Sequence, residues 1–296
     1  SAALRRQRSQ VRILSGAPVH GRDVSPGLHE GHRGQGMGDN QSTHFDRRAL
    51  LMGGAAAALG ACAREADLRR GESGRIANVS DGDLLALDTG QRVRLAEIEA
   101  PSPYGEGAPY GEEARDLLQR EAIGRTATLY YGGVSRDRYD RALAHVFVTD
   151  EVGRSTWLNG LMISQGAARV RTYADNAARA AQLYALEDTA RGNAQGLWAL
   201  EAYRLRSPSD WPAPSEPRAF IIAEGRLAAI DPAERYGVIR RDGDGLRLAP
   251  PASLDAAFAP AGLLAGAAVR MRGRTRITDD AVTIDFSHWQ QVEILA

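Results

Sequence analysis

The sequence predicts a mainly β fold with helices, of the α+β class, arranged as two domains. Residues 76–198 alternate short apolar strands with helical segments, whereas residues 219–295 contain short strands only. Between them, the proline-rich stretch SPSDWPAPSEP at 207–217 predicts a linker, which we assign to residues 201–217. A chain of 296 residues is long enough for two such domains.

Apolar runs separated by turn residues mark the strands of the first domain. IANVSDGDLLAL at 76–87 is a strand interrupted by an Asp-Gly-Asp turn, and RVRLAEI at 92–98 is the returning strand of a hairpin. Two further strands are expected at 126–133 and 141–148.

Three helices are expected in the same domain, at 110–124, about 155–166 and about 177–194. Ser155 would cap the second helix, and Asp175 or Asn176 would cap the third. The first helix has an apolar face made of Ala114, Leu117, Leu118 and Ala122.

The second domain, residues 218–296, contains only short strands separated by Gly or Asp turns at even spacing. This pattern predicts a small all-β barrel. The run RDGDG at 241–245 is interpreted as a hairpin turn and not as part of a calcium loop, because the rest of that motif's spacing is missing.

Composition excludes several classes of site. The formal net charge is zero, so bulk charge does not attract nucleic acid, and any phosphate affinity must arise locally. All 37 basic residues are arginine, whose planar fork suits phosphate. A single cysteine, Cys62, excludes an internal disulfide framework and a multi-cysteine metal site.

Residues 37–62 have the pattern of an export signal. Paired arginines precede a short apolar run at 49–59, and LGAC at 59–62 resembles a bacterial lipobox in which Cys62 is acylated. This predicts a lipid-anchored protein, exported to the cell envelope and held at the outer membrane or the periplasmic face, with residues 63–73 as a tether. The alternative is an ordinary buried helix with an isolated cysteine.

Residues 1–36 are interpreted as an over-extended reading frame upstream of Met37. Val-Arg-Ile at 11–13 back-translates to GTT-CGA-ATC, a T-loop sequence of transfer-RNA genes. The alternative is a genuine disordered extension.

Charged residues gather at the turns of the first domain. Asp81 and Asp83 flank Gly82, while Arg138 and Arg141 directly precede a strand. Carboxylate oxygens suit a hard cation, and arginines suit a phosphate whose charge grows in a transition state. Together they favour a site that acts on a phosphodiester.

Six ordered motifs lie within residues 74–200: VSDGD at 79–83, VRLAEIEAP at 93–101, YGEEA at 110–114, RDRYDRALAHVF at 136–147, LNGLMISQGAARV at 158–170 and GLW at 196–198. With these motifs, residues 74–200 resemble the thermonuclease (staphylococcal nuclease-like) family. The resemblance implies a five-stranded OB-type barrel carrying three helices, and calcium-dependent cleavage of DNA and RNA by water.

Residues 218–296 contain AEGRLAAI at 223–230, GAAVRMRGR at 266–274 and HWQQVEIL at 288–295. With these stretches they are similar to a second, OB-like barrel found in some bacterial members.

The resemblance assigns roles to individual residues. Asp83 matches a calcium-binding aspartate, and Glu99 stands at the position of the second, one methylene longer. Ala100 would offer its backbone carbonyl to the ion. Arg94 and Arg141 match the two arginines that act on the phosphate.

Ser102 stands where the family has the glutamate that activates water. A serine hydroxyl cannot act as that base at neutral pH, so we consider Glu106, or alternatively Glu97, as a substitute. Arg138 and Tyr173 are candidate substrate-binding residues.

The sequence therefore predicts a calcium-dependent endonuclease or phosphodiesterase acting on DNA or RNA, weakened by Ser102. The principal alternative is a catalytically inactive module that binds nucleic acid, another polyanion or a protein at the cell envelope. A third alternative is a purely structural envelope lipoprotein. The sequence indicates no particular protein partner, and its membrane contact would be the lipid on Cys62.

Overall fold

The structure, a computed structural model, describes residues 68–105, 107–211, 220–231, 237–278 and 281–295. The expected N-terminal extension (1–36), the expected signal peptide with Cys62, and Glu106 therefore lie outside the described residues. In the described part of the chain, no helix is long and apolar enough to cross a membrane.

Five strands of the first domain close into a barrel, which confirms the fold expected for it. These five are β1 (Arg69–Asp81), β2 (Leu84–Leu87), β3 (Arg92–Leu95), β5 (Thr126–Tyr131) and β6 (Ala142–Thr149). The domain also contains β4 (Ile98–Glu99), β7 (Ser155–Trp157) and β8 (Arg169–Val170). The order is β3-β2-β1-β5-β6, and β3 also pairs with β6 so that the sheet closes, while β7 extends it beyond β6. A separate short ladder joins β4 to β8.

Alternating side chains of these strands fill the barrel. Val93 and Leu95 of β3, Leu129 of β5, and Ala144 and Val146 of β6 are all fully buried in one core. This is the inward face that the period-two pattern of each strand predicts.

The strand β1 begins earlier than the sequence indicated. Arg69 and Arg70 pair with Tyr131 and Tyr130 of β5, so residues 69–73 of the expected tether belong to the strand. The stretch RRGES carries no apolar residue, which is why a hydrophobic pattern could not mark it as a strand.

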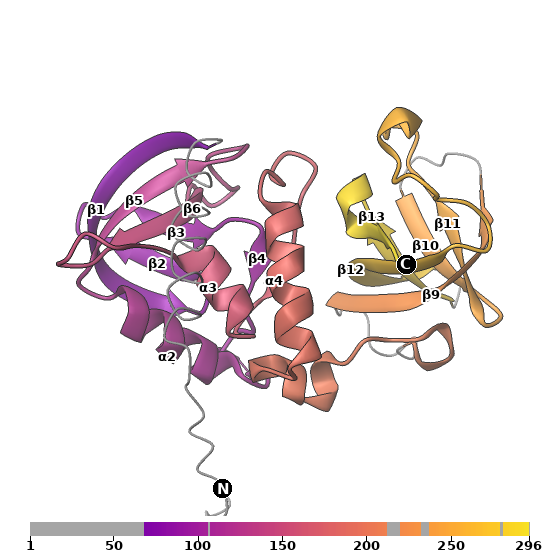
Figure 1. The fold of residues 1–296 in the computed structure, drawn as a ribbon, viewed down its shortest axis with the longest axis horizontal. Coiled ribbons are helices and arrows are strands. Elements are labelled where there is room, and N and C mark those ends of the chain that lie inside the picture. The colour runs from indigo at the N-terminus through magenta and orange to yellow at the C-terminus, as the bar shows by residue number, and fades with distance from the viewer. Residues whose placement is uncertain (1–67, 106, 212–219, 232–236, 279–280, 296) are drawn as a thin grey trace, which may run out of the picture. The chain divides into compact units, whose positions relative to one another are not determined.

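Three α-helices lie beside this barrel in the described residues: α2 (Gly111–Ala122), α3 (Leu158–Ser164) and α4 (Ala180–Gly192) (Figure 1). As expected, α2 buries Ala114, Leu118 and Ala122 against the barrel.

Two of the expected helix starts were wrong. Ser155 does not cap α3, because it pairs with Thr149 in the β6–β7 ladder, and the helix begins after Trp157. The helix α4 begins after Arg179 without a side-chain cap. Asn176, expected to cap it, instead donates from Nδ2 to the carbonyl of Val134 at 2.9 Å. Strand pairing thus places Ser155 outside the helix, and a tertiary hydrogen bond engages the side chain of Asn176.

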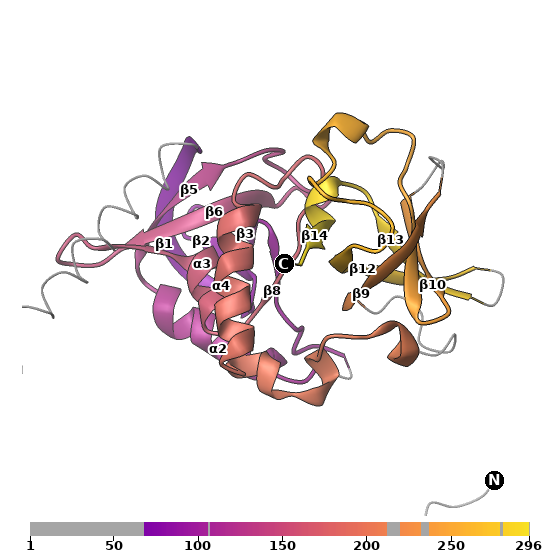
Figure 2. The same ribbon diagram turned by 45° about the vertical axis from the view of Figure 1, so that its right-hand side comes forward.

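The second domain contains a closed five-stranded barrel, also as expected (Figures 1 and 2). The barrel strands are β9 (Phe220–Ile230), β10 (Gly237–Asp242), β11 (Gly245–Ala249), β12 (Ala268–Thr278) and β13 (Ala281–Phe286). Their order is β13-β10-β11-β9-β12, and pairing of β13 with β12 closes the ring. A further short strand, β14 (Val292–Ile294), pairs with β12 outside the ring. Gly243 makes the β10–β11 turn with φ of 58°, a conformation that glycine adopts without strain.

Much of the expected linker is packed. Tyr203 lies in an apolar cluster with Trp198 and Ile222, and Trp211 belongs to the core of the second barrel. The proline-rich part at 212–219 lies outside the described residues.

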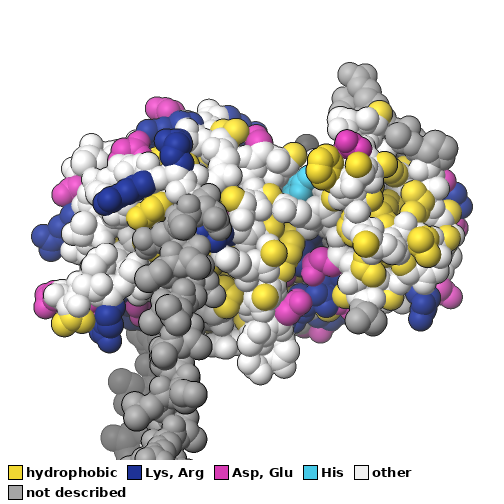
Figure 3. All heavy atoms as spheres, turned by 45° about the horizontal axis from the view of Figure 1, so that its top comes forward, with side chains coloured by type: hydrophobic (Ala, Val, Ile, Leu, Met, Phe, Trp, Pro, Cys, Tyr) yellow, Lys and Arg dark blue, Asp and Glu magenta, His cyan; other side chains and the backbone are white. Residues whose placement is uncertain are grey.

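Buried polar contacts join the second barrel to α4. Arg272 of β12 is fully buried and donates from Nη1 to Glu187 of α4 at 2.7 Å and from Nη2 to Glu293 of β14 at 2.5 Å. On the face shown in Figure 3, arginine and acidic side chains are intermixed, in keeping with the zero net charge.

Candidate active site

Asp83 is placed by the turn between β1 and β2. Gly82 precedes it, and a Cβ atom added to Gly82 would lie 2.6 Å from the Cβ of Ala100 and 2.9 Å from that of Ala114. Only glycine therefore lets the turn approach the start of α2 so closely. The result is that Asp83 points inward and is 2% exposed.

The buried carboxylate of Asp83 has two donors. Its Oδ2 accepts from Arg94 Nη2 at 2.9 Å and from the backbone N–H of Ala100 at 3.0 Å. Burial, helped by the nearby charges of Asp81 and Glu99, nevertheless raises the pKa of Asp83 to about 6. Burial of the Asp83 carboxylate thus outweighs the attraction of Arg94.

Parallel pairing of β3 with β6 brings the two predicted phosphate-binding arginines to the same rim. Arg94 pairs with Leu143 of β6, and Arg141 directly precedes β6, two residues before Leu143. Arg141 donates from Nε to Asp137 Oδ2 at 2.6 Å, and its backbone N–H donates to Asp137 Oδ1 at 3.0 Å.

The loop before β6 also carries Arg138. Its Nη2 donates to the hydroxyl of Tyr139 at 2.7 Å, and its guanidinium lies 4.7 Å from the Tyr139 ring centre. Arg141 lies 5.1 Å from the same ring centre. Tyr139 is 54% exposed, so the loop presents an aromatic ring between two arginines to solvent.

Glu99, predicted to bind a cation, is instead held by two arginines. Its Oε1 accepts from Arg171 Nη1 at 2.5 Å and from Arg274 Nη2, on β12 of the second barrel, at 2.9 Å. Its Oε2 is buried without a hydrogen-bond partner. We call this arrangement of Glu99, Arg171 and Arg274 the Glu99 clamp.

The residues present do not fit a dedicated calcium site. Calcium takes six to eight oxygen ligands, usually from several carboxylates. Here Glu99 is committed to the clamp, and Asp83 is paired with Arg94. Ala100 turns its N–H towards Asp83. Among the described residues, no group of three or more acidic, histidine or cysteine side chains is placed to hold a metal.

Ser102, at the position of the usual catalytic glutamate, is exposed and hydrogen-bonds to Asp81. Its Oγ also accepts from the N–H of Tyr104 at 3.3 Å. Burial raises the pKa of Asp81, against a hydrogen bond from the Gly82 N–H at 2.7 Å and the attraction of Arg94. The carboxylate hydrogen-bonded to Ser102 is therefore that of Asp81, whose pKa is raised.

Glu97 was wrongly considered as a substitute base. It is 2% exposed and accepts from the backbone N–H of Arg179 at 3.0 Å, and it shares a 3.0 Å hydrogen bond with His145 Nε2. The backbone of Glu97 has φ of 63°, which turns its side chain into the protein. Its side chain therefore links Arg179, at the start of α4, to His145 of β6 and has a structural role.

Tyr173, predicted to contact substrate, lies beside the Glu99 clamp. Its ring centre is 5.2 Å from the guanidinium of Arg171, and the residue is 42% exposed. It lines a pocket with residues of the second barrel.

No sequence pattern predicted the clamp, because Arg171 and Arg274 meet Glu99 only in the folded chain. Asp81 was singled out with Asp83 as part of the Asp-Gly-Asp turn, but it was assigned no role as a base.

Comparison with known proteins adds an independent line of evidence. A family model described as "Staphylococcal nuclease homologue" matches residues 92–200. The thermonuclease of Staphylococcus intermedius is 31% identical over 113 residues, which cover 36% of this chain and 64% of that protein. The chain thus spans a little under two thirds of that relative.

Two further relatives are matched over more of their length. The micrococcal nuclease of Shigella flexneri is 33% identical over 136 residues, covering 42% of this chain and 72% of that protein. Protein ParB of Escherichia coli is 31% identical over 179 residues, covering 55% of this chain and 96% of that protein.

Proposed function

Because the chain belongs to the staphylococcal nuclease family, we propose that its first barrel hydrolyses phosphodiester bonds of DNA or RNA. The observation that carries the proposal is the β3–β6 pairing, which sets Arg94 and Arg141 on one rim beside Asp83. Two guanidinium forks so placed suit a phosphate whose negative charge grows during attack by water.

The base in this proposal is Asp81. Water attacks phosphorus, its proton passes to the carboxylate of Asp81, and the bond from phosphorus to the leaving oxygen breaks. Burial raises the pKa of Asp81 and so makes its carboxylate a stronger base, and the hydroxyl of Ser102 orients it. Asp81 also accepts a hydrogen bond from the Gly82 N–H at 2.7 Å, which lowers its pKa. Its carboxylate is therefore a weaker base than burial alone would make it, and we expect slow cleavage.

Family members are calcium-dependent in general. In this chain Glu99 is held by Arg171 and Arg274, so we propose that any cation is bound weakly and requires a high calcium concentration. The charge that a tightly bound cation would supply is carried here by arginines.

The proposal includes export to the cell envelope. It is supported by the paired arginines and the LGAC sequence ending at Cys62. In a bacterial host the wild-type chain should fractionate with membranes, whereas Cys62→Ser should be released or remain unprocessed. A soluble, unmodified wild-type chain that retains residues 37–61 would refute the anchor.

A second candidate function is an inactive module that binds nucleic acid or another polyanion. It is favoured by Ser102, which removes the usual base while Arg94 and Arg141 remain.

A cleavage assay separates the two candidates. The purified chain would be incubated with plasmid, single-stranded DNA and RNA, each with calcium and with chelator. Arg141→Ala should lower the cleavage rate about 100- to 1,000-fold, the usual cost of losing a donor to the transition state. Asp81→Asn should lower it about 100-fold or more.

The matched control is Arg125→Ala, which removes an arginine paired only at the surface with Glu121. It should leave cleavage unchanged. A wild-type chain that binds nucleic acid in the same assay but never cleaves it would favour the inactive module.

A further inference from the structure

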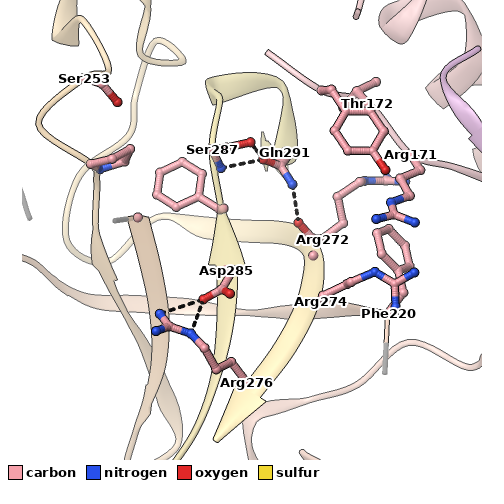
Figure 4. A pocket seen from close by; sticks show the side chains of 15 residues that line it. Arg171, Thr172, Phe220, Ser253, Arg272, Arg274, Arg276, Asp285, Ser287 and Gln291 are labelled. Atoms are coloured by element: carbon pink, nitrogen blue, oxygen red, sulfur yellow. Dashed lines mark hydrogen bonds and ion pairs between the residues drawn. The ribbon is translucent and has the colours of Figure 1, made fainter. Parts of the chain in front are cut away.

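A pocket opens beside the Glu99 clamp, with a volume of about 660 Å³ (Figure 4). Volumes of roughly 300–1,000 Å³ are typical of sites for small ligands. Residues 171–173 of the first domain contribute to its wall, and the remainder comes from the second barrel, including Phe220 at its start.

Arginine and aromatic side chains dominate the chemistry of the pocket. Besides Arg171, the strand β12 supplies Arg274 and Arg276, and Figure 4 shows Arg171, Phe220 and Arg274 close together at one side. The guanidinium of Arg171 lies 5.9 Å from the ring centre of Phe220. Guanidinium groups and flat rings together are the elements that bind phosphates and bases of single strands.

The cations of β12 are within reach of solvent. The side chain of Arg274 is 45% exposed and that of Arg276 is 43% exposed, and each is paired with a carboxylate, Glu99 and Asp285 respectively. Exposed ion pairs contribute little to stability. The Arg276–Asp285 pair is exposed on both sides, so an incoming phosphate can replace Asp285 at low cost. Glu99, the partner of Arg274, is only 14% exposed and keeps Arg171 as a second partner when a phosphate binds Arg274. Arg272 differs, because it is fully buried between Glu187 and Glu293.

The pocket adjoins the Glu99 clamp. Arg171 and Arg274 line the pocket and also hold Glu99. Glu99 is followed directly by Ala100, whose backbone N–H donates to Asp83, the partner of Arg94. The pocket and the candidate active site are therefore connected through neighbouring residues of the chain.

We propose that this pocket binds one or two nucleotides of a single strand, with phosphates on Arg274 and Arg276 and a base against Phe220. The inference rests on the proposed function, which it deepens by making the second barrel part of the substrate site. A duplex keeps its bases stacked inside and cannot offer one to Phe220, so the pocket selects single strands.

Binding of a labelled oligonucleotide tests the proposal without relying on cleavage. Fluorescence anisotropy would be measured with the purified chain, excess chelator and a fluorescein-labelled eight-residue deoxyadenylate. Phe220→Leu keeps apolar bulk but removes the ring, and should weaken binding about tenfold. Arg276→Ala should weaken binding and lower the slope of log affinity against log salt by about 0.7.

Two controls make the result specific to the pocket. Arg226→Ala removes an exposed arginine of β9 that donates to the carbonyl of Gly266, outside the pocket, and should leave affinity unchanged. An abasic strand of equal length should bind the wild-type chain about tenfold more weakly and be insensitive to Phe220→Leu.

Equal affinity of the wild-type chain for the abasic strand, or for a duplex, would overturn the proposal. So would an unchanged salt slope in Arg276→Ala, whose exposed side chain is not needed for folding. Cleavage with calcium but no effect of these variants would reject the pocket alone. Sensitivity of binding to them without any cleavage would reject the nuclease proposal alone.

Discussion

At the scale of single residues, the proposed base is the carboxylate of Asp81, which is hydrogen-bonded to Ser102. Ser102→Glu should raise the cleavage rate by one to several orders of magnitude, because it adds a base at the exposed position of the hydroxyl. Ser102→Gln, of nearly the same size but without charge, is the control for altered shape. Initial rates on single-stranded DNA would be compared, and equal rates for the two variants would contradict the prediction.

Asp83 should make stability depend on pH. Its pKa is raised from an ordinary 3.8 to about 6 in the folded chain, mainly by burial. The folded state therefore holds this proton more tightly than the unfolded state. Stability from this group is fully present below about pH 4 and is lost as pH rises through about 6, by roughly 1–3 kcal/mol.

The measurement is urea unfolding of the wild type and Asp83→Asn at pH 4.5 and pH 7. The wild type should lose stability relative to the variant as pH rises. A difference between the two proteins that stays constant, or that changes in favour of the wild type, would show that Arg94 outweighs burial at this carboxylate.

At the scale of elements, the β1–β2 turn positions the site through a close backbone approach. Gly82→Ala should destabilise the fold by about 1–3 kcal/mol, because the new Cβ would meet Ala100 and Ala114 at under 3 Å. It should also reduce cleavage, since Asp83 is the next residue. Gly192→Ala, where a Cβ meets nothing within 4 Å, is the matched control in thermal unfolding. Similar melting temperatures for the two variants would contradict the prediction.

At the scale of the whole described chain, buried ion pairs fasten the second barrel to α4. Arg272→Ala would leave Glu187 and Glu293 without their shared partner and should cost about 3–5 kcal/mol. Denaturant unfolding would measure the loss. If the barrels depend on this contact, cleavage of single strands should fall as well, although Arg272 is far from any predicted catalytic role.

The Glu99 clamp should control cation binding at the same scale. Arg274→Ala removes one of the two arginines that pair with Glu99 and should tighten calcium binding several-fold. The reason is that the negative charge of Glu99, next to Asp83, is then less neutralised. Isothermal titration calorimetry with calcium would compare it with Arg226→Ala, which lies outside the clamp. Identical calcium affinities would mean that Glu99 does not limit the cation.

Much of the architecture could be predicted from the sequence, for a physical reason. Alternating apolar residues and Gly or Asp turns are local properties of the chain, so strands of both barrels could be predicted from the sequence. Arg94 and Asp83 were also recognisable, since they belong to short motifs whose geometry is fixed by a hairpin. Helix starts were less predictable, because Ser155 lies in the β7 strand and the side chain of Asn176 bonds to the carbonyl of Val134, 42 residues away, instead of capping.

Only the tertiary structure decided what surrounds the predicted site residues. The motif around Glu99 predicts a metal ligand, yet Glu99 forms an ion pair with Arg274, which lies 175 residues away in the sequence. Glu97 was considered as a substitute base, yet it is buried and hydrogen-bonded to His145 and to the N–H of Arg179. A local pattern specifies which side chains a segment offers, but charges interact through space, so their partners are set only when the two barrels fold against each other.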